Sequence, residues 1–102
     1  MTEVGTRPLR ELLDAHRDEI HDIVARHRGR SVAVFGSVAR GDETPGSDID
    51  LLVELEPGTR PFAILELGAD LEEALGVRVD VGTVDSLRDR LRADVLAEAI
   101  PL

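Results

Sequence analysis

The chain has 102 residues, with 12 basic and 21 acidic side chains and a formal net charge of −9. This length fits a single domain over residues 1–102, with one hydrophobic core and little room for a separate substrate domain. The acidic balance argues against direct binding of nucleic acid, which needs a basic surface. The 12 basic residues are all Arg, and the chain contains no Lys, Cys, Tyr or Trp. A Schiff-base lysine, a thiolate nucleophile, a disulfide framework and a cysteine zinc site are therefore excluded.

The first part of the chain predicts a helix from Pro8 to about Arg28. Pro8 suits a first helical turn and Gly29 suits the position just after a helix. No apolar run reaches the roughly 18 residues of a membrane span, and the N-terminus lacks a signal-like pattern, so we expect a cytoplasmic protein. The core-facing stripe of the helix consists of Leu9, Leu12, Leu13, Ile20, Ile23 and Val24. We interpret His16, His21 and His27, on or beside this stripe, as packing or surface residues.

Two strands are predicted to follow this helix. Residues 31–35, SVAVF, form a short apolar run that ends at Gly36, and we expect it to be covered on both faces. Residues 47–55 alternate, so that one face is apolar and the other begins with carboxylates. The apolar face carries Ile49, Leu51, Val53 and Leu55, and the other face carries Asp48, Asp50, Leu52 and Glu54.

The second half of the chain predicts two more helices and one strand. Residues 64–75 carry a helical stripe that Gly76 closes, and residues 77–81 alternate as a third strand whose polar face carries an Asp. Asp85 or Ser86 can cap a last helix, with Leu87, Leu91, Val95 and Ala99 on one face, and Pro101 stops it. This order of elements predicts an α/β fold, a small mixed β-sheet flanked by helices.

The acidic residues at the start of the second strand indicate a metal site. Asp48 and Asp50 leave the same face roughly 6–7 Å apart, and Asp80 joins them if its strand is a neighbour with a matching face. Like charges about 4 Å apart repel by roughly 4 kcal/mol at an effective dielectric of about 20, so a positive group must compensate. For Asp80 alone, a structural salt bridge with Arg78 is the alternative. For the pair, such hard oxygen ligands suit Mg²⁺ or Mn²⁺.

The stretch GSVARG, directly after the first strand, indicates a phosphate-binding turn. Gly36 permits close backbone approach, the next residues can begin a helical turn whose N–H groups face an anion, and Ser37 adds a hydroxyl. A Walker A loop is excluded because no Lys follows Gly41. Arg40 is either a phosphate contact or a surface charge. We interpret the adjacent Asp42 and Glu43 as solvated loop charges.

The combination of G-S-x-A-R-G, S-D-I-D-L-L-V and an Asp in the following strand resembles the DNA polymerase β-like nucleotidyltransferase superfamily. More narrowly, it resembles the minimal nucleotidyltransferases, short proteins that are often paired with HEPN-domain toxins. The resemblance implies a polymerase β-like core that binds two Mg²⁺ ions, with Mn²⁺ as an alternative, and ATP as substrate. The site residues that it implies are Asp48, Asp50 and Asp80 for metal binding and catalysis, and Gly36, Ser37 and Arg40 for the nucleotide.

The same resemblance implies the transfer of AMP from ATP to a protein hydroxyl, a tyrosine of a cognate HEPN RNase toxin, so that the protein acts as an enzymatic antitoxin. Self-modification on tyrosine is excluded because the chain contains none. One alternative is a non-catalytic antitoxin whose acidic surface covers a basic RNase. A second alternative is transfer to tRNA or a small molecule, which the net charge of −9 and the missing substrate domain disfavour.

Overall fold

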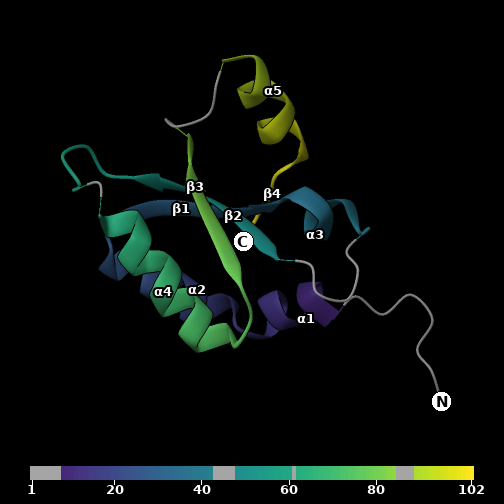
Figure 1. Cartoon of the computed structure of the whole chain (residues 1–102), viewed down its shortest axis with the longest axis horizontal. Helices are drawn as coiled ribbons and strands as arrows, with labels where there is room; N and C mark the ends of the chain where they lie inside the picture. The colour runs from purple at the N-terminus through teal and green to yellow at the C-terminus, as the bar shows by residue number, and fades with distance from the viewer. Residues whose placement is uncertain (1–7, 43–47, 61, 85–88) are drawn as a thin grey trace.

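The computed structural model of the chain describes residues 8–42, 48–60, 62–84 and 89–102. Helices and strands alternate along most of it (Figure 1). The elements in chain order are α1 (Pro8–Ala15), α2 (Arg17–Arg26), β1 (Gly29–Phe35), α3 (Gly36–Arg40), β2 (Ile49–Leu55), α4 (Ala63–Leu75), β3 (Val79–Thr83), α5 (Asp89–Glu98) and β4 (Ile100–Pro101).

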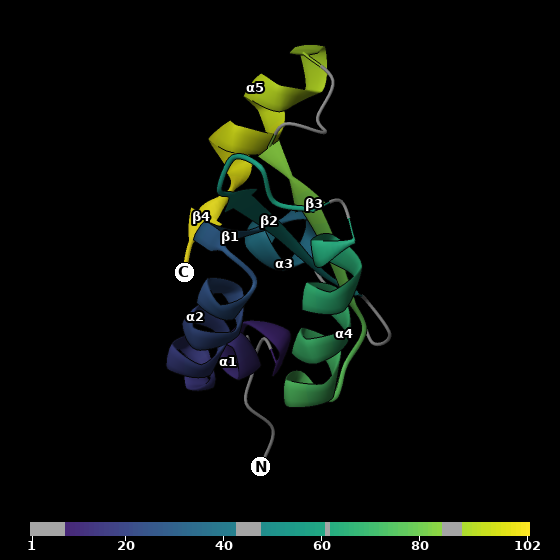
Figure 2. The same ribbon diagram turned by 90° about the vertical axis from the view of Figure 1, so that its left-hand side faces the viewer.

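The four strands form one mixed sheet in the order β3-β2-β1-β4. β1 is antiparallel to β2 and to β4, whereas β2 and β3 run parallel. Helices α1, α2 and α4 lie together on one side of this sheet, and α5 lies on the other side (Figure 1, Figure 2). The structure therefore confirms the predicted small mixed sheet flanked by helices. No helix in the described residues is long and apolar enough to cross a membrane.

The hydrophobic core fills the space between the sheet and helices α1, α2 and α4. The predicted alternation along β2 is confirmed, because Ile49, Leu51 and Val53 are fully buried in this core while Glu54 is exposed. Leu67, Leu71 and Leu75 of α4 and Ile20, Ile23 and Val24 of α2 pack against them. Burying such side chains stabilises the fold by about 1.5–3 kcal/mol each. The other face of β2 is mixed, because it carries the half-buried Asp50 and the exposed Glu54 together with Leu52, which is buried.

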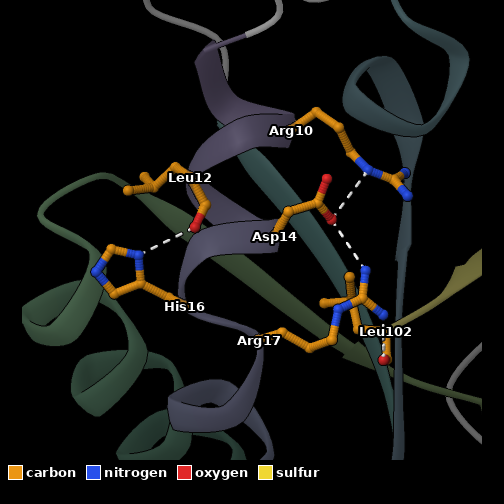
Figure 3. Close-up of polar contacts among 6 residues, drawn as sticks. All are labelled: Arg10, Leu12, Asp14, His16, Arg17 and Leu102. Carbon is orange, nitrogen blue, oxygen red and sulfur yellow. Dashed lines mark hydrogen bonds and ion pairs between the residues drawn. The ribbon is translucent and has the colours of Figure 1, made fainter.

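The predicted first helix is two helices that meet at His16. The structure of this junction is nearly helical: the His16 N–H donates to the carbonyls of Leu12 (3.1 Å) and Leu13 (3.2 Å), and Ile20 N–H donates to the His16 carbonyl (2.9 Å). The His16 ring also contributes, since Nδ1 donates to the Leu12 carbonyl over 3.0 Å (Figure 3). The prediction of one continuous helix is wrong at this residue, which has no Gly or Pro to announce the break.

The end of α2 also differs from the prediction. Gly29 is not the left-handed residue after the helix: Arg28 has φ 67° and Gly29 already belongs to β1. Gly29 is needed for a different reason, because a Cβ there would overlap Cγ1 of Val24 and lie 3.0 Å from the Val24 carbonyl oxygen. By contrast, the prediction that Gly76 closes α4 is confirmed, with φ 72° at the cap.

Three predicted strand and helix details need correction. In β1, Val32 and Val34 are buried on the core face but Ala33 and Phe35 are only half-buried, so the second face is not fully covered. The third strand spans 79–83 rather than 77–81, because its pairing begins with Val79 opposite Ile49. Pro101 does more than stop α5, since the residues after this helix form β4. The proposed caps Asp85 and Ser86, with Leu87 and Ser47, lie outside the described residues.

Candidate functional site

Strand register brings three of the predicted site residues into one row across the sheet. Phe35, the last residue of β1, is paired with Asp50 of β2, and Asp50 is paired with Asp80 of β3. Gly36 follows Phe35 directly. The expectation that Asp50 and Asp80 lie on neighbouring strands with matching faces is confirmed. The row runs from the start of α3, over the centre of the sheet, to the edge strand β3.

Gly36 and Asp50 are in close contact. Gly36 has φ +74°, a left-handed conformation that costs other residues free energy, and a Cβ on it would overlap Oδ2 of Asp50 and lie 3.1 Å from Cγ. Both the backbone conformation and the space therefore require glycine. Ser37 lies half-buried in the first turn of α3, beside this contact. The turn and the carboxylate form one site.

The electrostatic environment of Asp50 is strongly negative. Partial burial, followed by the nearby carboxylates of Asp80 and Asp48, raises the pKa of Asp50, and Arg40 opposes this shift only in part. Arg78, which the sequence offered as a partner for Asp80, instead approaches Asp48: Nε lies 4.0 Å from Oδ1, with the Arg side chain 86% exposed. Such an exposed ion pair contributes little. Among the described residues, the protein's own cations therefore offset the negative charge at Asp50 only in part.

This charge and the donor chemistry fit a divalent cation. Asp48, Asp50 and Asp80 offer carboxylate oxygens, the hard ligands that Mg²⁺ prefers, and the excess negative charge at Asp50 would be relieved by a bound cation. In the structure as it stands, the described residues hold no group of three His, Asp or Glu side chains already arranged around one ion position. Coordination would therefore require rotation of these exposed or half-buried carboxylates.

Arg40 and a residue that the sequence did not single out, Glu98, complete the surroundings of α3. The Gly36 N–H donates to Oε1 of Glu98 (3.0 Å), and Nη1 of Arg40 donates to the same oxygen (3.1 Å). Nε of Arg40 also donates to Asp42 (3.2 Å). Hydrogen bonds to Asp42 and Glu98 raise the pKa of Arg40. One sequence signal could have identified Glu98: it is an acidic residue in the last turn of α5, where the helix dipole disfavours negative charge.

A cleft of about 670 Å³ lies further along β2 and β3, beyond the carboxylates. Its walls include Glu54 and Arg30, which pair with each other over 3.0 Å, and Gly82, the second residue after Asp80. The sequence patterns did not predict this cleft, because it depends on how the connection after β2 folds back beside β3. Asp48, Asp50 and Asp80 are not among the residues that line it, so the cleft is separate from the carboxylate row.

Comparison with known proteins agrees with this geometry. Residues 14–102 match the nucleotidyltransferase domain family. The protein adenylyltransferase MntA of Thermococcus cleftensis is 35% identical over 98% of both chains. A Methanocaldococcus jannaschii protein named as a protein adenylyltransferase is 38% identical over 80% of this chain and 88% of its own.

Solved structures give the same result. The structure of a minimal nucleotidyltransferase superimposes with a TM-score of 0.83 at 47% identity, covering 91% of this chain and 95% of that one. A chain from a toxin–antitoxin structure with AMP-PNP shares the fold, with a TM-score of 0.71 at 24% identity over 82% of this chain and 69% of its own. The resemblance inferred from the Gly-Ser and Asp-x-Asp motifs is thus confirmed, and this chain belongs to the nucleotidyltransferase family, as a minimal nucleotidyltransferase related to the protein adenylyltransferases.

Proposed function

We propose that this protein transfers AMP from ATP to a tyrosine hydroxyl of a HEPN-domain toxin and thereby acts as its antitoxin. The row formed by Gly36, Asp50 and Asp80 supports this proposal, because a glycine turn whose donors suit a phosphate lies beside carboxylates that suit a cation. Two observations on other proteins support it: a relative aligned over 98% of both chains is named protein adenylyltransferase MntA, and the structure of an AMPylated Shewanella oneidensis HEPN toxin in complex with MNT antitoxin contains a chain of this fold.

In this reaction α3 binds the leaving end of the nucleotide. The N–H of Gly36, the hydroxyl of Ser37 and the guanidinium of Arg40 are donors that can bind the β- and γ-phosphate oxygens. Gly36 lies against Asp50, so a triphosphate held there has its α-phosphate beside the carboxylates. With the nucleotide in this position, the bond that breaks in the proposed reaction is the one between the α-phosphorus and the pyrophosphate oxygen.

The acceptor then approaches from the side of β3. In an in-line displacement the attacking and leaving oxygens lie on opposite sides of the phosphorus, so a leaving group at α3 requires an acceptor hydroxyl near Asp80. Asp80 is exposed on the edge strand of the sheet, where a side chain of another protein can reach it. As the new bond from the hydroxyl oxygen to phosphorus forms, Asp80 accepts the hydroxyl proton and pyrophosphate departs.

Asp48, Asp50 and Asp80 are also the residues that would hold Mg²⁺. Bound there, Mg²⁺ supplies charge stabilisation for the phosphate oxygens and acidifies the acceptor hydroxyl. Asp50 itself provides a partly desolvated carboxylate directly beside the Gly36 turn. Holding reacting groups in this fixed geometry is the main contribution that a protein makes to phosphoryl-type transfer.

Intact-mass spectrometry of a co-purified HEPN-domain toxin, after incubation with ATP and Mg²⁺, tests the proposal. We expect a mass gain of one or more adenylyl groups with the unaltered protein and none with Asp48→Asn/Asp50→Asn. Glu73→Gln, which removes an exposed carboxylate on α4, is the matched control and should leave transfer unchanged.

Peptide mapping then locates the adduct. An adduct on tyrosine supports the proposed acceptor, and one on serine or threonine contradicts it. Tight complex formation and neutralisation without any mass gain would instead establish a non-catalytic, occluding antitoxin.

A further inference from the structure

The phosphate-binding turn is already engaged by a carboxylate of the protein itself. Oε1 of Glu98 accepts hydrogen bonds from the Gly36 N–H over 3.0 Å and from Nη1 of Arg40 over 3.1 Å. These are two of the donors that the proposed function assigns to the triphosphate. A carboxylate oxygen and a phosphate oxygen are both anionic acceptors, so each can accept hydrogen bonds from the same N–H and guanidinium.

The fold delivers Glu98 to this position through the end of the chain. Glu98 is the last residue of α5, and the next strand, β4, pairs with β1 through Ile100 and Val34. The Leu102 N–H donates to the Val32 carbonyl (3.0 Å), which extends this pairing. In turn, the Leu102 carbonyl accepts a 2.7 Å hydrogen bond from Nη1 of Arg17 (Figure 3). The backbone that carries Glu98 is therefore held at both the sheet edge and the start of α2.

The negative charge of Glu98 is unfavourable at the end of α5 unless the Gly36 N–H and Arg40 compensate it. A negative charge in the last turn of a helix opposes the helix dipole, and α5 has no basic residue in that turn to offset it. The Glu98 side chain remains 32% exposed, so solvent reaches it and it has space to rotate. Arg40 and the Gly36 N–H compensate the charge only while the side chain points at α3.

We propose that Glu98 is an internal competitor of the nucleotide triphosphate: its carboxylate occupies the donors of Gly36 and Arg40 until nucleotide displaces it. This inference rests on the proposed function, which places the triphosphate at these donors. Gly36 has a single N–H, so it cannot serve Glu98 and a phosphate oxygen in the same geometry. Nucleotide binding thus requires the Glu98 side chain to turn away, while the pairing of β4 with β1 keeps the backbone in place.

Calorimetric titration of AMP-PNP with Mg²⁺ into three variants tests this competition. Glu98→Ala removes the carboxylate and Glu98→Gln removes only its charge. Asp94→Asn is the matched control, because Asp94 is an exposed acid one turn earlier on α5. If about nine molecules in ten have Glu98 bound to Gly36 and Arg40, removing that contact increases the apparent affinity for AMP-PNP about tenfold. We therefore expect Glu98→Ala to bind AMP-PNP about three- to tenfold more tightly. Glu98→Gln should show a smaller gain and Asp94→Asn none.

The outcomes separate this inference from the proposed function. If the unaltered protein binds AMP-PNP but Glu98→Ala binds it equally or more weakly, Glu98 is not a competitor, and a loss of affinity would make it a residue that positions Arg40. If neither protein binds AMP-PNP, both proposals fall together.

A second readout does not depend on affinity. In the unaltered protein the NMR shift of the Gly36 amide should change on nucleotide binding, while the amide of Leu102 keeps its protection from exchange. Loss of that protection would contradict a movement confined to the side chain. Thermal unfolding of each variant verifies that it is folded before binding is compared.

Discussion

Replacing Gly36 by alanine should separate backbone strain from damage to the site. Gly36 has φ +74°, and Gly76, at the end of α4, has φ +72° with nothing within 4 Å of a built Cβ. A left-handed conformation costs a non-glycine residue roughly 1–2 kcal/mol, so both Gly36→Ala and Gly76→Ala should lose about that much stability. For a domain of this size, each kcal/mol lowers the unfolding temperature by about 4–8 °C.

Only Gly36→Ala should also impair transfer. The new Cβ would overlap Oδ2 of Asp50 and lie 3.1 Å from its Cγ and 3.3 Å from its Cβ. The clash is with the end of a side chain, so we expect Asp50 to rotate away rather than the backbone to shift. Displacing a reacting group by about 1 Å can cost on the order of 100-fold in rate, and we expect a loss of that size.

The assay combines thermal unfolding with initial rates of AMP transfer, followed by intact-mass spectrometry, for the unaltered protein and both variants. Equal losses of stability with a transfer defect confined to Gly36→Ala would support the contact with Asp50. The reasoning is refuted if the two variants transfer AMP equally well, since transfer would then not depend on the absence of a Cβ beside Asp50.

Three further predictions concern stability. The pKa of Asp50 is raised above 3.8 in the folded state, so this carboxyl favours folding while it is protonated, and that contribution is lost as pH rises through 3.8 and the folded pKa. Asp50→Asn should therefore raise the unfolding temperature of the metal-free protein at neutral pH, and the gain should disappear below pH 3.8. Mg²⁺ should raise the unfolding temperature of the unaltered protein but not of Asp48→Asn/Asp50→Asn, with reversal by a chelator; equal shifts in both would place the ion elsewhere. Gly29→Ala should cost about 1–3 kcal/mol in urea unfolding, because its Cβ would overlap Val24, whereas an unchanged midpoint would show that α2 can move aside.

The carboxylate row could be predicted because strand alternation fixes side-chain faces. Parity alone places Asp48 and Asp50 on one face, and the same rule applied to the third strand selects Asp80. Strand alternation does not predict the order of the strands in the sheet. It therefore could not show that β3 pairs with β2 rather than lying beyond β1. The family resemblance supplied that expectation, and the pairing of Asp50 with Asp80 agrees with it.

Glu98 could not be found in the same way, because its position depends on contacts distant in the sequence. It lies 62 residues from Gly36, and β4, which anchors it, has two residues and contains Pro101. Such a short strand has no periodicity to detect, and a proline more often indicates a turn. The break at His16 was missed for the opposite reason: its hydrogen bonds are so close to helical that the apolar stripe continues across it.

The short strand β4 also affects how the protein behaves at high concentration. It covers one edge of the sheet with a residue, Pro101, that has no N–H to offer to a further strand. Within the part of the chain that the structure describes, β3 is therefore the edge at which a second sheet could add. That edge carries Asp80 on a chain of net charge −9, and two such edges repel each other. We therefore expect Asp80, the carboxylate proposed for catalysis, also to oppose aggregation through this edge of the sheet.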